Sequence, residues 1–380
     1  MMVKQNISLV VILAELLLAV ASNGVCSPGS CQAHDICAKD SDCAADLKCT
    51  NCSSADDMNY RCTRFSVTDP VSQVGDLPFN RYSWLTTHNS FAIVGEKSYT
   101  GTERITFCNQ EDSVTNQLNN GVRGLMLDMY DFENDVWLCH SNGTCFNVTA
   151  FMPAIITLKE IAAFLAANPS EIITIFIEDY VKAPKGLTKV FTAAGLMKYW
   201  FPVSRMPQNG EDWPTVNDMI SKNQRLIVFT SQSSKEASEG IAYEWKYVVE
   251  NQYGDEGLLN GSCVNRAESK NLTSKSQSLF LENFFPTIPS IPETCSVNSD
   301  RLSNMLNVCY EKAGKRWANF LAVNFYKRSY GGGAFQAVDK LNGQLICGRN
   351  DITECQANVT SGVCNNRYNT KVSPMGSAST

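Results

Sequence analysis

The chain has 380 residues, enough for one large domain and a small one, with a net charge of −6 and a hydrophobic share of 44%. The negative charge gives no electrostatic reason to expect nucleic-acid binding, and it argues against unaided adhesion to anionic membranes. Sixteen cysteines would be unusual in a reducing compartment, so the composition favours a secreted, disulfide-bonded protein.

The first residues have the pattern of a secretory signal. Lys4 supplies a positive charge, residues 7–20 are mostly apolar, and residues 19–21 (Ala-Val-Ala) offer a small-residue cleavage site. We therefore expect a signal peptide over residues 1–21 and no transmembrane span in the mature chain, because the apolar run is short for one. The alternative is an ordinary buried helix, which Glu15 within the run favours.

Residues 22–66 are predicted to form a small cysteine-rich module that disulfides hold together, since they contain little apolar material for a core. A zinc site with His34 is the alternative, but paired short-spaced cysteines are missing. The number of cysteines is odd, so we expect at least one to bond to the main domain or stay free. The seven are Cys26, Cys31, Cys37, Cys43, Cys49, Cys52 and Cys62.

After a predicted polar linker at residues 68–77, patterns of strands and helices alternate to about residue 345. Strands are expected where short apolar or β-branched runs occur, and an eighth near 247–250 has a weaker pattern. The runs are 85–87, 125–127, 136–138, 172–177, 225–229, 279–281 and 320–326.

Helices are predicted between these strands. One ends at Asn120 before Gly121, one covers 157–165 with a capping box from Thr157 to Glu160, and others cover 216–221 and 334–344. Asn168-Pro169 ends the second. The alternation predicts an α/β fold, a TIM-like barrel over residues 67–345.

Polar side chains follow several of the strands. The carboxyl ends of barrel strands form one mouth, so His88, Asn89, Asp128, His140 and Glu178 are expected to converge there. Two of the three histidines belong to this set. Apolar residues within the strands are expected to form the barrel core; these are Trp84, Met126 and Phe176. Aromatic residues of the loops are expected either to pack under long loops or to seat the protein on a bilayer; these are Trp200, Phe201, Trp213, Phe284 and Phe285.

Residues 346–380 are predicted to be a polar tail with disulfides from Cys347, Cys355 and Cys364, and Cys139 is expected to pair with Cys145. The end is small and polar, without the apolar tail of a lipid-anchor signal, so the protein is expected to be freely secreted unless the chain is a truncated form of an anchored one. A monomer is expected. Sequons for glycosylation begin at Asn51, Asn142, Asn147, Asn260, Asn271 and Asn358.

Three ordered motifs carry a resemblance: His88-Asn89-Ser90 after a strand, Gly121-Val122-Arg123 with Asp128 on the next, and His140 after the third. Over about residues 79–330 the chain resembles the X domain of phosphatidylinositol-specific phospholipase C, above all secreted plant proteins with a single X domain. The resemblance implies cleavage of the phosphodiester of an inositol phospholipid or glycolipid, with His88 and His140 as acid and base.

The resemblance also implies a metal. Calcium-dependent relatives have Asn, Asp and Glu where this chain has Asn89, Asp128 and Glu178, and these oxygen ligands suit Ca²⁺. The relatives have a further carboxylate where this chain has Met126. The site is therefore expected to bind calcium weakly, to use another carboxylate such as Asp131 or Asp179, or to be inactive.

Two more residues match positions of the family. Arg123 is expected to be structural, pairing with a carboxylate under the barrel mouth, with a phosphate contact as the alternative. Asn324 is expected to orient a histidine or a sugar hydroxyl, or simply to cap a strand. Two other functions remain open: a glycerophosphodiester phosphodiesterase, whose His-Arg-Gly motif is absent, and a non-catalytic cell-surface or wall-binding protein, which Met126 favours.

Overall fold

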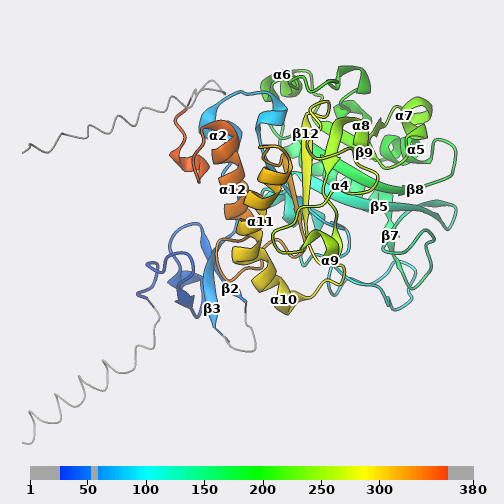
Figure 1. Cartoon of the computed structure of the whole chain (residues 1–380). Coiled ribbons are helices and arrows are strands. Elements are labelled where there is room, and N and C mark those ends of the chain that lie inside the picture. Colours follow the sequence, from blue (N-terminus) through cyan, green and yellow to red (C-terminus); the bar gives the residue numbers. More distant parts are fainter. Residues whose placement is uncertain (1–25, 53–58, 358–380) are drawn as a thin grey trace, which may run out of the picture.

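The computed structural model describes residues 26–52 and 59–357 (Figure 1). The predicted signal peptide, Cys364 and the sequon at Asn358 lie outside the described residues.

Eight parallel strands form a curled sheet, which confirms the predicted TIM-like α/β barrel. No hydrogen-bonded pairing within the described residues joins β10 to β11, so the barrel is open along one seam. In spatial order the strands are β10 (Ala242–Tyr243), β9 (Leu226–Thr230), β8 (Ile173–Tyr180), β5 (Gly124–Phe132), β4 (Trp84–Thr87), β13 (Phe320–Val323), β12 (Leu279–Phe284) and β11 (Val248–Glu250).

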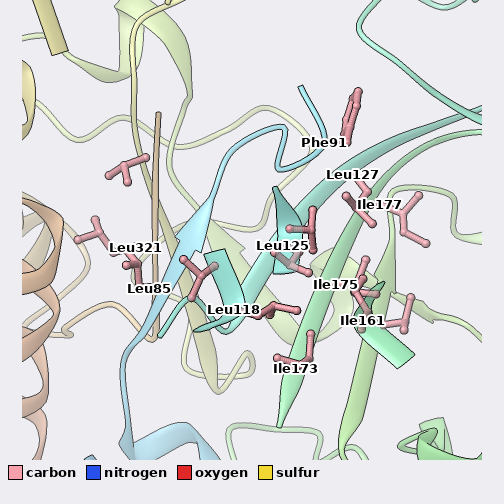
Figure 2. Close-up of a cluster of buried hydrophobic side chains, with 14 of the residues drawn as sticks. Leu85, Phe91, Leu118, Leu125, Leu127, Ile161, Ile173, Ile175, Ile177 and Leu321 are labelled. Atoms are coloured by element: carbon pink, nitrogen blue, oxygen red, sulfur yellow. The ribbon is translucent and has the colours of Figure 1, made fainter. Parts of the chain in front are cut away.

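Alternation along each strand separates two cores. Leu125 and Leu127 of β5 point outward and pack with neighbouring strands and the covering helices, as Figure 2 shows. Trp84 and Phe176 belong to the second cluster, inside the barrel, and Met126 packs against it. The predicted core residues are therefore confirmed, and the inward face of β5 carries Asp128 beyond Met126 toward the mouth.

Helices lie between most of the strands, and several match the prediction closely. They are α2 (Pro70–Val74), α3 (Val114–Asn119), α4 (Ala154–Ala167), α5 (Gly186–Ala193), α6 (Val216–Ser221), α7 (Ser234–Glu239), α8 (Glu244–Tyr247), α9 (Gly254–Gly257), α10 (Ile291–Ser296), α11 (Leu302–Lys312) and α12 (Gly333–Ile346).

The strand predicted at residues 136–138 exists, but it is not a barrel strand. It is β6 (Asp135–Cys139), which runs antiparallel to β5 and pairs on its other side with β7 (Ala150–Pro153). Residues 133 and 134 have positive φ and make the tight turn between β5 and β6. A short apolar run does not encode its direction, so the sequence could not distinguish a hairpin from a crossover.

Three boundaries differ from the prediction. Helix α4 begins at Ala154, so the capping box at Thr157 is wrong; the Glu160 carboxylate instead accepts hydrogen bonds from the backbone and hydroxyl of Thr115. The predicted linker contains α2, which Asp69 caps. The last strand ends at Val323, because Phe325 adopts a left-handed φ of 43°, which a strand cannot continue.

The cysteine-rich module has a three-stranded sheet of β1 (Ile36–Cys37), β2 (Leu47–Asn51) and β3 (Tyr60–Arg64) beside α10–α12 (Figure 1). Arg64 forms an ion pair with the buried Asp339 of α12. Disulfides engage all seven cysteines, so the zinc alternative has no free thiolates: Cys26–Cys31, Cys37–Cys49, Cys43–Cys62 and Cys52–Cys295. The last confirms a bond from the module to the main domain.

The main domain has three further disulfides. Cys139–Cys145 confirms the predicted pair, Cys347–Cys355 closes the start of the tail, and Cys263 bonds to Cys309 of α11. Cys108 is the free cysteine of the described residues. Seven disulfides are typical of an extracellular protein.

The loop aromatics named from the sequence do not form a membrane-contacting surface. Phe201, Trp213, Phe284 and Phe285 are at most 3% exposed, and Trp200 is half-buried against the outer core. Phe284 ends β12 and packs in the outer core, and the others pack beneath the surface, in agreement with the first alternative. Within the described residues, the helices are too short or too polar to cross a bilayer.

Candidate active site

His88 follows β4, where an asparagine holds its ring. Nδ1 of His88 lies 2.9 Å from Oδ1 of Asn324, which follows the neighbouring strand β13. Nδ2 of Asn109 donates to the same oxygen at 3.1 Å, which fixes the orientation of the Asn324 amide. Nδ2 of Asn109 also lies 3.3 Å from Nδ1, but the shorter contact is to a carbonyl oxygen, which only accepts. We therefore assign the proton to Nδ1, which leaves Nε2 as the free acceptor of the ring.

The His88 ring is packed under an aromatic lid. Phe285 stacks on it with ring centroids 3.7 Å apart and an interplanar angle of 6°. Burial lowers the pKa of His88 to about 3; the hydrogen bond to Asn324 opposes this shift, while the charges of His140 and Arg266 add to it. A neutral imidazole is therefore the resting state of His88 at physiological pH.

His140 reaches the mouth from the antiparallel strand β6. Its Nδ1 lies 3.0 Å from the backbone oxygen of Phe107, so this nitrogen carries the proton and Nε2 is again free. The Cys139–Cys145 disulfide constrains the chain directly before the histidine. His140 is also close enough to His88 to lower its pKa electrostatically.

Asn89 and Asp128 form a second pair at the mouth. With its nitrogen turned to the carboxylate, the Asn89 amide donates to both Asp128 oxygens at 3.0 and 3.2 Å. With its oxygen turned there, the pair would present three oxygens to one cation. Asn89 has a left-handed φ of 43°, which asparagine tolerates better than most residues. Burial and the Glu178 charge raise the pKa of Asp128 well above its ordinary value, while Arg266 lowers it.

Glu178 lies opposite Asp128 in the register of β5 and β8, but its side chain is exposed and accepts a hydrogen bond from the Tyr180 hydroxyl. In the described part of the chain, no three acidic or histidine ligand atoms lie within 4.8 Å of one another; only three disulfide-bonded cysteines do. An oxygen site built on Asn89 and Asp128 would include Glu178 only if the Glu178 carboxylate left Tyr180.

The two carboxylates considered as substitutes at Met126 lie elsewhere. Asp131 accepts from the backbone nitrogens of Lys182 and Ala183, at 2.6 and 2.9 Å, beside the β5–β6 hairpin. Asp179 follows Glu178 on β8, so it points to the outer face, and it accepts from Thr230 Oγ1 at 2.7 Å. Neither residue lines the small cavity beside His88 at the barrel mouth, whereas Met126 does.

A cavity of about 50 Å³ lies between His88 and a cluster of charged residues on the far side of the mouth. Nη1 of Arg266 donates to Glu250 at 3.0 Å and its Nε to Glu268 at 3.1 Å. Trp245 and Tyr253 place their rings about the guanidinium, with centroids 5.0 and 4.9 Å away. Arg266 is therefore a fixed cation in a mostly acidic mouth.

Arg123 does not reach the mouth. It directly precedes β5, at the opposite end of the barrel, where its Nε donates to Glu171 at 2.6 Å and its Nη1 to the backbone oxygens of Leu118 and Val122. A contact with a phosphate bound beside His88 is incompatible with this position. Gly124 then starts the strand because a Cβ there would lie 2.2 Å from Thr86 Oγ1.

Sequence reasoning missed several residues of the site. Glu250 ends β11, so recognising that strand with more certainty would have identified it. Glu244 directly follows β10, a strand of only two residues that no apolar run in the sequence marks. Asn109 and Arg266 lie within long connections, and no local signal in the sequence marks them. Their positions depend on how long connections fold over the barrel.

An open parallel barrel with two histidines and an Asn–Asp pair at its mouth has the fold and residues of a phosphodiesterase-type protein. Residues 78–342 match the family described as PI-PLC X 1. The chain therefore belongs to the PI-PLC X-domain family.

Several known proteins are similar to the chain. It is 54% identical over 352 residues to the PI-PLC X domain-containing protein At5g67130 of Arabidopsis thaliana, covering 92% of this chain and 83% of that protein. An uncharacterized secreted protein of Arthroderma benhamiae is 26% identical over 263 residues, or 63% of this chain and 58% of its own length. The solved phosphatidylinositol-specific phospholipase C of Listeria monocytogenes aligns with 70% of this chain and 93% of its own, at 16% identity and a TM-score of 0.46.

Proposed function

We propose that the protein is a secreted phosphodiesterase that cleaves inositol phospholipids or inositol-containing glycolipids. The observation that carries this proposal is the pair of histidines at one mouth, each with Nδ1 held by a carbonyl oxygen and Nε2 free. Family membership supports the same class of reaction.

The chemistry follows from the two free nitrogens. One Nε2 takes the proton of the inositol 2-hydroxyl while that oxygen attacks phosphorus, and the bond from phosphorus to the diacylglycerol oxygen breaks. The leaving oxygen takes a proton from Nε2 of the other histidine, which enters the reaction as an imidazolium and leaves it as a neutral ring. The product is a cyclic inositol phosphate, which water can open by the reverse proton transfers. A neutral His88 suits the base, which leaves the role of the acid to His140.

Ca²⁺ would supply positive charge beside the phosphate. Asn89 and Asp128 would hold it, with Glu178 as a further oxygen ligand, and these donors fit a hard cation. The protein's own contribution to this charge is Arg266, whose Nη2 makes no hydrogen bond to any described residue.

A lipid surface is the partner we propose for the mouth. Segments that leave the carboxyl ends of β4, β6, β11 and β12 carry most of the large exposed apolar side chains in the described residues. Such residues around a mouth can enter the interfacial region of a bilayer and need no positive charge to do so. They are Val94, Tyr99, Ile105, Phe107, Phe146, Tyr253, Leu259, Val264 and Ile288.

A non-catalytic binding protein is the second candidate, and one observation favours it. Phe285 covers His88, and the cavity beside it is far smaller than the roughly 300 Å³ at which ligand pockets usually begin. Met126 adds to this case, because it removes a carboxylate from the inward face of β5.

The deciding experiment is release of water-soluble inositol phosphate from phosphatidylinositol vesicles by the purified protein, with Ca²⁺ and with chelator. A His88→Ala variant is the control for contamination. Calcium-dependent release that this variant lacks supports the enzyme and its metal together. Release that continues in the presence of chelator supports the enzymatic function but not the Ca²⁺ site. If folded protein releases no inositol phosphate, the non-catalytic binding protein is favoured.

A further inference from the structure

One connection of the barrel contacts the partners of both histidines. Residues 88–113 join β4 to α3, and within them the backbone oxygen of Phe107 accepts the hydrogen bond from Nδ1 of His140. Two residues later, Nδ2 of Asn109 donates to Oδ1 of Asn324, the amide oxygen that also accepts from His88. Asn109 is therefore the side chain through which this connection can act on the ring of His88.

The backbone of Asn109 is held on both sides. Its nitrogen donates to the backbone oxygen of Ala92 at 2.8 Å, and its oxygen accepts from the backbone nitrogen of Phe325 at 2.8 Å. The residue is 1% exposed, so bulk water does not compete for its amide. The donor Nδ2 is thus kept in one place, next to the amide of Asn324.

The amide of Asn324 is not held from its nitrogen side. Its Nδ2 is buried and has no hydrogen-bond partner among the described residues. If this amide turned over, its Nδ2 would face Nδ2 of Asn109, and two donors would meet without an acceptor. Asn109 therefore disfavours the turned amide and keeps Oδ1 of Asn324 toward His88.

The orientation of this amide decides which nitrogen of His88 carries the proton. Oδ1 of Asn324 only accepts, so Nδ1 of His88 donates to it, and Nε2 keeps its lone pair. The turned amide would donate from Nδ2 to Nδ1, and the proton of the neutral ring would move to Nε2. That tautomer cannot accept a proton at Nε2, so it could not serve as a base there.

We propose that Asn109 is a positioning residue that sets the tautomer of His88 through the amide of Asn324. This inference rests on the proposed function, because the tautomer matters for the reaction only if Nε2 of His88 takes a proton. Asn109 supplies no group to the reaction; it fixes the direction of an amide that has no other donor to orient it. His140 needs no such residue, because its partner is a backbone oxygen that cannot turn over.

The experiment observes the tautomers by NMR and needs no turnover. Proton–nitrogen spectra of isotope-labelled histidines distinguish a proton on Nδ1 from one on Nε2, and the chain has three histidines to assign. At neutral pH the ring of His88, with a pKa of about 3, is uncharged. We expect Asn109→Ala to lower the ratio of the Nδ1–H to the Nε2–H form of His88 about tenfold, the effect of one hydrogen bond. The pattern of His140 should not change.

Asn298→Ala is the matched control. This equally buried asparagine also contacts Asn324, but its Nδ2 donates to the backbone oxygen, at 3.0 Å. The control should lower stability in a similar way and leave the tautomer ratio of His88 unchanged. In protein that already carries Asn324→Ala, the change Asn109→Ala should have no further effect on the ratio, because the amide through which it acts is gone.

Turnover gives a second readout. In the release of inositol phosphate from phosphatidylinositol vesicles, Asn109→Ala should lower kcat about tenfold and leave KM within about twofold, because the wrong tautomer removes the base and not the binding site. A loss confined to KM would contradict a role in setting the tautomer of His88.

Several results would overturn the inference. One is a wild-type His88 with its proton on Nε2, a test that does not depend on how a variant folds. Another is an unchanged ratio in Asn109→Ala; a rise would mean that Asn109 donates directly to Nδ1 of His88 across the 3.3 Å between them. An equal change in Asn298→Ala would indicate a structural effect. The expected change in ratio, without phosphodiester cleavage by wild-type protein, would overturn the proposed function and leave the effect of Asn109 on the tautomer standing.

Discussion

Oδ1 of Asn324 and Nδ1 of His88, 2.9 Å apart, connect the last and the first strand of the barrel in the sequence. An amide oxygen at this place selects the tautomer of His88 without adding a charge, so burial still dominates the pKa of the ring.

Changing the acceptor should therefore change the titration of His88. A carboxylate in Asn324→Asp stabilises the imidazolium, so we expect the pKa of His88 to rise from about 3 toward its ordinary value. Asn324→Ala removes the acceptor and should lower any turnover about 100-fold by releasing the tautomer. Histidine resonances followed by NMR during a pH titration measure the first effect; an unchanged midpoint in the Asp variant would contradict it.

Burial of His88 should also lower the free energy of unfolding at acidic pH. The pKa of His88 is about 3 in the fold and about 6.5 in an unfolded chain, so between these values the unfolded state binds more protons. Stability linked to His88 is complete above about pH 6.5 and is lost toward pH 3, with a slope of up to about 1.4 kcal/mol per pH unit. Urea unfolding at several pH values should show a smaller slope for His88→Gln than for wild type, and equal slopes would exclude the burial described above.

Removing the lid should open the cavity. Phe285→Ala takes away the ring that covers His88, so we expect faster modification of His88 by diethylpyrocarbonate and a loss of about 3 kcal/mol in unfolding free energy. Phe284→Ala is the matched control, because that side chain packs in the outer core and should cost similar stability. If diethylpyrocarbonate modifies His88 at the same rate in both variants, destabilisation of the fold, and not removal of the covering ring, is responsible.

Restoring the missing carboxylate should strengthen calcium binding. Met126→Glu places an acidic group two residues before Asp128 on the same inward face, and we expect about a tenfold gain in Ca²⁺ affinity. The increase in melting temperature with added Ca²⁺ measures it. Asp128→Asn should abolish the increase, and a Met126→Glu protein that ignores Ca²⁺ would show that these strand ends do not form the site.

The disulfide between the cysteine-rich module and the barrel should stabilise the fold more than a disulfide within the module. Cys52–Cys295 closes a loop of 243 residues and Cys26–Cys31 one of 5. Replacing the first pair by serine should lower the unfolding free energy by about 2–5 kcal/mol, and replacing the second should cost less. Denaturant unfolding of both double variants compares them; the opposite order would mean that the module does not restrain the barrel.

Sequence reasoning identified the residues of the site that lie on or directly after long strands. His88 and Asn89 follow β4, and Asp128 lies on β5, because buried strands have a strong apolar pattern and polar residues that end it stand out. The same reasoning gave β6 the wrong direction yet placed His140 at the mouth, since the long strand β5 and its hairpin bring it back to the level of Asp128. Glu244 could not be placed because β10, which it follows, has only two residues. Phe285 directly follows β12, but its contact with His88 depends on long-range packing, as does the position of Arg266 in its connection.

The open seam between β10 and β11 bears on whether strands of other chains can pair with the barrel. An unclosed wall has two edges, and exposed edges invite pairing with strands of other chains. Here β10 has two residues and β11 three, and the chain between them is the short helix α8. So few unpaired backbone groups make a poor template for aggregation. The open seam therefore offers another chain only two short strands to pair with.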